Sequence, residues 1–141
     1  MIFNFFKKKK EIDLVIKCDT DIIVINEKEI NFPTNYDTLI AVLGEPDREI
    51  HKTNHYMFWD KQGIFCGYTN KNNILSINAY QNKQNKSEYN TQHQFKGKLL
   101  LNNEDITNNE FGKIPLGKIA IHRLGKENEV RVGFNLGINK N

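Results

Sequence analysis

The run Tyr36-Asp-Thr-Leu-Ile-Ala-Val-Leu-Gly-Glu-Pro-Asp-Arg48 encodes one short helix with a defined end. Its apolar residues recur at helical spacing, which predicts one buried face. Thr34 or Asn35 can cap the helix, because a short side-chain oxygen accepts hydrogen bonds from the free N–H groups of the first turn. Gly44 falls where helices commonly end in a left-handed backbone conformation, and Pro46 blocks continuation of the helix.

Around this run the dominant period of apolar residues is two, which is typical of strands with one buried face. Tyr56-Met-Phe-Trp59 is apolar on both faces, as expected of a central strand. The loop over residues 60–63 ends in Gly63, where a hairpin needs a positive φ. The predicted strands cover residues 12–18, 22–25, 30–32, 47–51, 56–59, 64–69, 74–80, 95–101, 118–123 and 129–136.

These elements predict the fold class α+β, a mostly antiparallel β-sheet meander with one short principal helix at about residues 35–43. A chain of 141 residues fits one domain with one hydrophobic core. We expect residues 1–10 to form a basic N-terminal tail or edge segment and residues 11–141 to form the domain. Residues 81–94 have almost nothing to bury, so we expect a mobile loop there.

The charge of the chain is unevenly distributed. The formal net charge is +3, but the segment Lys7–Lys10 supplies four positive charges, and residues 11–141 hold 16 basic and 17 acidic side chains. This balance argues against a nucleic-acid-binding domain. Residues 11–60 hold 11 acidic and 4 basic side chains, whereas residues 61–141 hold 6 acidic and 12 basic ones. An acidic surface from the first half is therefore one possible outcome of folding.

The N-terminal segment does not read as an export signal, because its apolar residues precede the lysines and are too few. No stretch approaches the roughly 18–20 apolar residues of a membrane span. We therefore expect a cytoplasmic protein without an integral membrane segment. Cys18 and Cys66 each lie in a strand-like apolar run, which favours buried, reduced thiols.

The sequence offers no arrangement of residues typical of catalysis. His51 and His55 have a spacing that would suit metal ligation on a helix, but here they flank a turn between strands. No Glu or Cys beside them is placed to complete a site, so we expect no metal. Cys66 has no cationic neighbour in sequence that would lower its thiol pKa. We expect neither an enzyme nor a bound cofactor.

Three segments together resemble a known type of protein: Leu39-Ile-Ala-Val-Leu-Gly-Glu-Pro-Asp-Arg48, Trp59-Asp-Lys-Gln-Gly-Ile64 and Phe95-Lys-Gly-Lys-Leu-Leu-Leu-Asn102. They resemble a family of small uncharacterised bacterial domains with a Leu-Gly-x-Pro helix end, a Trp-Asp-x-x-Gly-Ile hairpin and a Phe-x-Gly-x-Leu strand. Such domains resemble immunity proteins of polymorphic-toxin or secretion systems. The helix end also resembles that of outer-membrane assembly lipoproteins and β-lactamase-inhibitor proteins, which are exported binding modules. The resemblance covers the middle of the chain, residues 25–103.

The resemblance implies an immunity-type protein that binds and neutralises a cognate protein toxin or effector. Acidic side chains around the helix end would suit a basic partner through steering and charge pairing. Tyr56 or Trp59 would anchor the contact if exposed, and the alternative is that Trp59 belongs to the core. The other reading of the chain is a non-enzymatic small-ligand-binding or scaffold module. The candidate partner-binding residues are Asp37, Glu45, Asp47, Glu49, Tyr56 and Trp59.

Overall fold

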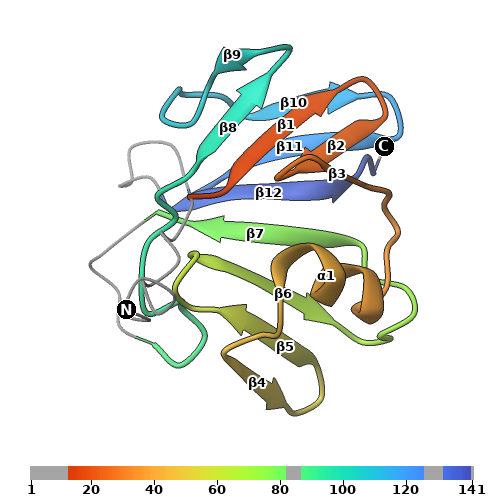
Figure 1. Cartoon of the computed structure of the whole chain (residues 1–141), viewed down its shortest axis with the longest axis vertical. Coiled ribbons are helices and arrows are strands. Elements are labelled where there is room, and N and C mark those ends of the chain that lie inside the picture. Colours follow the sequence, from red (N-terminus) through yellow and green to blue (C-terminus); the bar gives the residue numbers. More distant parts are fainter. Residues whose placement is uncertain (1–12, 82–86, 126–131, 141) are drawn as a thin grey trace, which may run out of the picture.

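Two β-sheets and one short helix make up the computed structural model, which describes residues 13–81, 87–125 and 132–140 (Figure 1). One sheet has seven strands and is antiparallel throughout, and the other has five strands and is mixed. The predicted fold class, mostly antiparallel strands with one short helix, is confirmed. The division of the strands between two sheets was not predicted. The predicted N-terminal tail lies outside the described residues.

The five-stranded sheet has the strand order β3-β2-β1-β8-β9. Its first three strands form the predicted antiparallel meander, but β8 pairs with β1 in parallel. Parallel partners need a long crossover connection, and here the chain between the two strands runs through the other sheet. The strands are β1 (Val15–Asp19), β2 (Ile22–Ile25), β3 (Lys28–Ile30), β8 (Lys98–Leu101) and β9 (Glu104–Asp105).

The strand β3 starts two residues earlier than the pattern predicted. Asn26 and Glu27 both adopt positive φ angles, of 47° and 71°. Positive φ at both central residues is the mark of the two-residue turn that matches strand twist. The tight turn brings Ile30 opposite Ile23. The third strand therefore ends at residue 30, which was the first residue of the predicted strand.

The seven-stranded sheet has the order β10-β11-β12-β7-β6-β5-β4. The predicted meander of three strands around residues 56–80 is present as β5-β6-β7. The predicted closing hairpin is β11-β12, and β12 docks against β7; residues 129–131 of its predicted second strand lie outside the described residues. The strands are β4 (Arg48–His51), β5 (His55–Trp59), β6 (Ile64–Tyr68), β7 (Ser76–Tyr80), β10 (Lys113–Leu116), β11 (Ile119–Leu124) and β12 (Gly133–Ile138).

The helix α1 (Tyr36–Leu43) forms where predicted, and Asn35 is its N-cap. The Asn35 side-chain oxygen accepts a hydrogen bond from the Thr38 N–H at 2.8 Å. Gly44 has a positive φ of 88°, as predicted, but its ψ of −179° is not the left-handed helical value. This extended conformation with positive φ is reached essentially by glycine alone. It turns the Gly44 carbonyl toward the Trp59 side chain, whose Nε1–H donates to it at 2.8 Å.

The hydrophobic core lies between the two sheets and under α1. In Figure 1, α1 lies in front of β6 and the strands β1 and β2 lie in front of β11 and β12, and residues from both sheets and the helix form one buried cluster. Cys18 and Cys66 belong to it as free, buried thiols, as predicted. Burial raises the pKa of each thiol to about 12. No helix in the described part of the chain is long and apolar enough to cross a membrane.

Residues 87–94 are held to the seven-stranded sheet by polar contacts, in contrast to the expected loose loop. The Arg48 guanidinium donates to the carbonyls of Glu88 and Asn90. The Asp60 carboxylate accepts from the Gln92 N–H at 2.9 Å and pairs with Arg48 at 2.8 Å. Apolar patterning does not reveal an anchor of this kind, because the contacts are made by backbone groups of the segment. Residues 82–86 lie outside the described part of the loop.

Candidate functional site

The charges of three of the four predicted acidic residues act on the Tyr36 side chain. Asp37 follows it in the first turn of α1, Glu45 lies just beyond the helix end, and Glu49 projects from β4. The Tyr36 hydroxyl donates to the Glu49 carboxylate at 3.4 Å. Desolvation and then the charge of Glu49 raise the pKa of Tyr36, and the charges of Glu45 and Asp37 add to the rise. We call Tyr36, Asp37, Glu45 and Glu49 the acidic patch.

Asp47 is exposed but points elsewhere. Its carboxylate accepts a hydrogen bond from the Lys61 N–H, at 3.3 Å, in the turn after β5. It is not among the charges that act on Tyr36. Of the four predicted acidic residues, Asp37, Glu45 and Glu49 therefore act on Tyr36, and Asp47 is set apart from them.

Trp59 is completely buried, with no exposed surface. Because β5 alternates, Met57 and Trp59 face the core and Tyr56 faces the opposite side of the sheet. Tyr56 is partly exposed and packs edge-on against Tyr89, with ring centroids 5.1 Å apart. Trp59 is thus a core residue, and Tyr56 lies on a different face from the acidic patch.

Sequence reasoning placed His51 and His55 on either side of a turn, but it missed that Tyr68 extends them into a row of side chains at the turn end of the β4–β5 hairpin. His51, His55 and Tyr68 are direct cross-strand partners on β4, β5 and β6. The two histidine Nδ1 atoms lie 2.9 Å apart. The His55 and Tyr68 rings pack with centroids 5.3 Å apart. The available signal was the three-residue turn over 52–54, which makes the residues on either side of it direct partners.

The row adjoins the acidic patch through Glu49. The Glu49 Oε1 atom lies 3.9 Å from His51 Nε2. Burial and then the charge of Glu49 raise the pKa of Tyr68 to about 12. No group of three or more His, Cys, Asp or Glu side chains in the described ranges has an arrangement suited to a metal ion.

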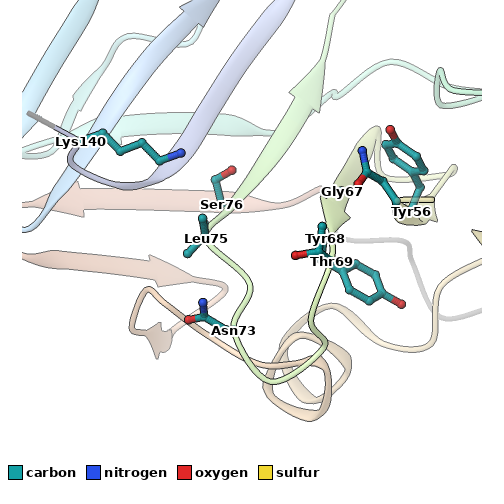
Figure 2. Close-up of a pocket in the computed structure, with 9 residues that line it drawn as sticks. Tyr56, Gly67, Tyr68, Thr69, Asn73, Leu75, Ser76 and Lys140 are labelled. Atoms are coloured by element: carbon teal, nitrogen blue, oxygen red, sulfur yellow. The ribbon is translucent and has the colours of Figure 1, made fainter. Parts of the chain in front are cut away.

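A groove of about 290 Å³ lies where β6 and β7 separate. These strands pair only at Ile64–Ala79 and Phe65–Asn78, and beyond those pairs the chain segments diverge. Figure 2 shows the Lys140 side chain reaching toward Ser76 from the C-terminal segment. The lining holds one cation and otherwise neutral side chains: Asn54, Tyr56, Gly67, Tyr68, Thr69, Asn73, Leu75, Ser76 and Lys140.

The fold is a two-sheet domain of mostly antiparallel strands with a single short helix, an acidic patch beside that helix and a shallow polar groove. The chain belongs to the family described as a domain of unknown function, DUF7738, whose model matches residues 15–115. The match spans β1 to β10 and includes the segments that carried the resemblance to a family of small domains. Comparison of the chain with curated proteins and with solved structures found no match.

Proposed function

We propose that this protein is a cytoplasmic immunity-type protein that binds and neutralises a cognate toxin or effector with a basic contact surface. The observation that supports the proposal is the acidic patch, in which Glu49 contacts Tyr36 and the charges of Glu45 and Asp37 also act on it. Like charges gathered on one surface repel one another, and a basic partner relieves that repulsion. Such a surface also speeds encounter with a basic protein.

Tyr36 gives the patch more than charge. It is partly buried and packs against the core cluster, while its hydroxyl reaches Glu49. A tyrosine held in one position presents apolar area at little cost in side-chain entropy, which is why tyrosines are frequent among the residues that dominate interface energies. We therefore propose that Tyr36 and the neighbouring acidic residues contact the toxin, and that Tyr36 takes the anchoring role considered for Trp59.

The proposal is tested by expressing the protein encoded by the gene next to this one in bacteria, as the candidate toxin, with and without this protein. We expect the protein to restore growth and to co-purify with the toxin as a stoichiometric complex. Growth arrest that persists at equal expression, or rescue without a complex, would contradict the proposal.

The contact surface is tested by reversing one charge. Glu45→Lys should slow association with the partner by about tenfold at low salt, and the difference should shrink at high salt because exposed charges are screened. Glu104→Lys is the matched control, since it makes the same charge change on an exposed residue of β9 in the other sheet. Association rates are measured by stopped flow or surface plasmon resonance. Equal rates for the two variants at low salt would remove the acidic patch from the interface.

The groove beside β7 supports the second candidate, a small-ligand-binding module. Its volume of about 290 Å³ lies at the lower end of the range of about 300–1,000 Å³ seen for ligand pockets. A screen of small-molecule fragments, followed by measurement of amide chemical-shift changes, distinguishes the small-ligand-binding module from the immunity-type protein. Shifts confined to residues such as Asn73 and Ser76, together with failure of the toxin test, would favour the ligand-binding module.

A further inference from the structure

We propose that His51 and His55 form a chelating pair for a divalent metal ion that favours square-planar coordination, with Cu(II) the preferred ion. The two residues are direct cross-strand partners at the end of the β4–β5 hairpin. Their Nδ1 atoms face each other at 2.9 Å, with the ring planes inclined at 60°. Imidazole nitrogen is a common ligand of copper, nickel and zinc.

The separation of the two nitrogens can be compared with the spacing that each coordination geometry requires. Two imidazole nitrogens held at about 2.0 Å from an ion lie about 2.8 Å apart when they subtend 90° and about 3.3 Å apart at the tetrahedral angle. The observed 2.9 Å is close to the square-planar value. Square-planar nitrogen sites are typical of Cu(II) and Ni(II), and Cu(II) also binds most tightly in the general order of divalent ions.

The surroundings position both rings for this role. With His51 Nδ1 directed at the metal, its proton resides on Nε2, which faces the Glu49 carboxylate at 3.9 Å. At this distance the carboxylate makes no hydrogen bond to the ring, but its negative charge favours a cation bound to the other ring nitrogen. Tyr36 donates to the other oxygen of Glu49, and the Tyr68 ring packs against His55. These contacts hold both histidines at the hairpin end.

The site is open to solvent on the side away from the protein. The His51 side chain is 56% exposed, and His55 is partly exposed. Water molecules can therefore supply the remaining ligands of the ion. In the absence of metal, a proton shared between the two Nδ1 atoms accounts for their short separation.

The test titrates the purified full-length protein with Cu(II) and follows the electron paramagnetic resonance spectrum. We expect one ion per chain, an axial spectrum split by two nitrogens, and a higher melting temperature that EDTA reverses. In the wild-type protein, amide signals of residues 50–56 should broaden first. Zn(II) should bind at least about tenfold more weakly.

Variants distinguish the proposed metal ligands from the residues that contact those ligands. His55→Gln should abolish the two-nitrogen splitting and weaken binding by about a hundredfold, whereas Glu49→Gln should weaken binding by about tenfold and keep the splitting. His93→Gln is the matched control, because it removes an exposed imidazole elsewhere, and it should bind as the wild type does. Circular dichroism verifies that each variant is folded. Wild-type affinity in a His51→Gln/His55→Gln variant, or first broadening of signals outside residues 50–56, would overturn the proposal.

Discussion

Gly44 and Trp59 illustrate how one backbone angle supports the core. The positive φ at Gly44 ends α1 and turns its carbonyl to accept from the Trp59 indole. The indole is thereby satisfied at a position with no exposed surface, where an unpaired N–H group would cost about 1–3 kcal/mol. This hydrogen bond thus links the end of α1 to β5, the strand next to the edge strand β4.

Replacing Gly44 tests this link at the level of one residue. A Cβ at Gly44 would meet no atom within 4 Å, so Gly44→Ala is opposed only by the backbone conformation. We expect the free energy of unfolding to fall by about 1–3 kcal/mol, as measured by urea denaturation. Gly112→Ala is the control, because its Cβ also meets nothing within 4 Å and its φ is not in the positive range. Equal stability of the two variants would contradict the strain assigned to Gly44.

At the level of elements, one arginine attaches a polar segment to the edge of a sheet. Arg48 of β4 contacts Asp60, the carbonyls of Glu88 and Asn90, and the face of the Phe58 ring, 3.9 Å from its centroid. Phe58 lies on the face of the sheet opposite the core and is nevertheless fully buried. The arginine and the segment after residue 86 therefore cover a second, smaller apolar surface.

Arg48 on β4 and Lys52 in the turn after it both contact the segment after residue 86. Replacing each by alanine should lower the stability of the protein by different amounts. The Asp60 carboxylate is almost fully buried, so Arg48→Ala leaves a buried charge without its partner and should cost about 2–4 kcal/mol. Lys52 pairs with Glu88 at 3.0 Å, but both side chains are more than half exposed. Lys52→Ala should therefore cost much less stability than Arg48→Ala, because solvent screens the exposed pair. Urea denaturation measures both, and a similar loss in the two variants would contradict the role given to Arg48.

At the level of the whole molecule, the fold extends beyond the family match. The match ends at residue 115, in β10, yet β11 and β12 lie between β10 and β7 in the same sheet. They also contribute buried side chains to the common core, among them Ile121, Phe134 and Leu136. The matched region alone therefore lacks the strands that connect its last strand to the rest of the sheet.

A truncated chain tests this dependence. Residues 1–116 should fail to form a cooperative fold, because β7 would lose its partner β12 and the core would lose one wall. Near-ultraviolet circular dichroism and thermal denaturation compare this fragment with the full chain. A cooperative melting transition in the fragment would show that the matched region is a complete folding unit.

Local sequence signals predicted much of this molecule because they act at fixed, short separations. The helix with its Asn35 cap, the positive φ at Gly63, the alternation of β7 and the burial of both cysteines follow from neighbouring residues. Asp37, Glu45 and Glu49 were candidate residues because they lie close together in sequence, and their role in binding stays a prediction. The row of His51, His55 and Tyr68 was not predicted, since it depends on the register of three strands.

Which strands pair was decided by the folded chain as a whole. Several apolar strands of similar length are interchangeable by pattern, so nothing local distinguishes β8 as the parallel partner of β1 or divides the strands between two sheets. That choice depends on which combination of pairings buries both sheets and the helix around one core, at an acceptable loop-closure entropy. The helix, turns and alternating strands therefore follow from the residues alone, whereas the partners of each strand, and the side chains they bring together at the surface, follow only from the packing of the complete chain.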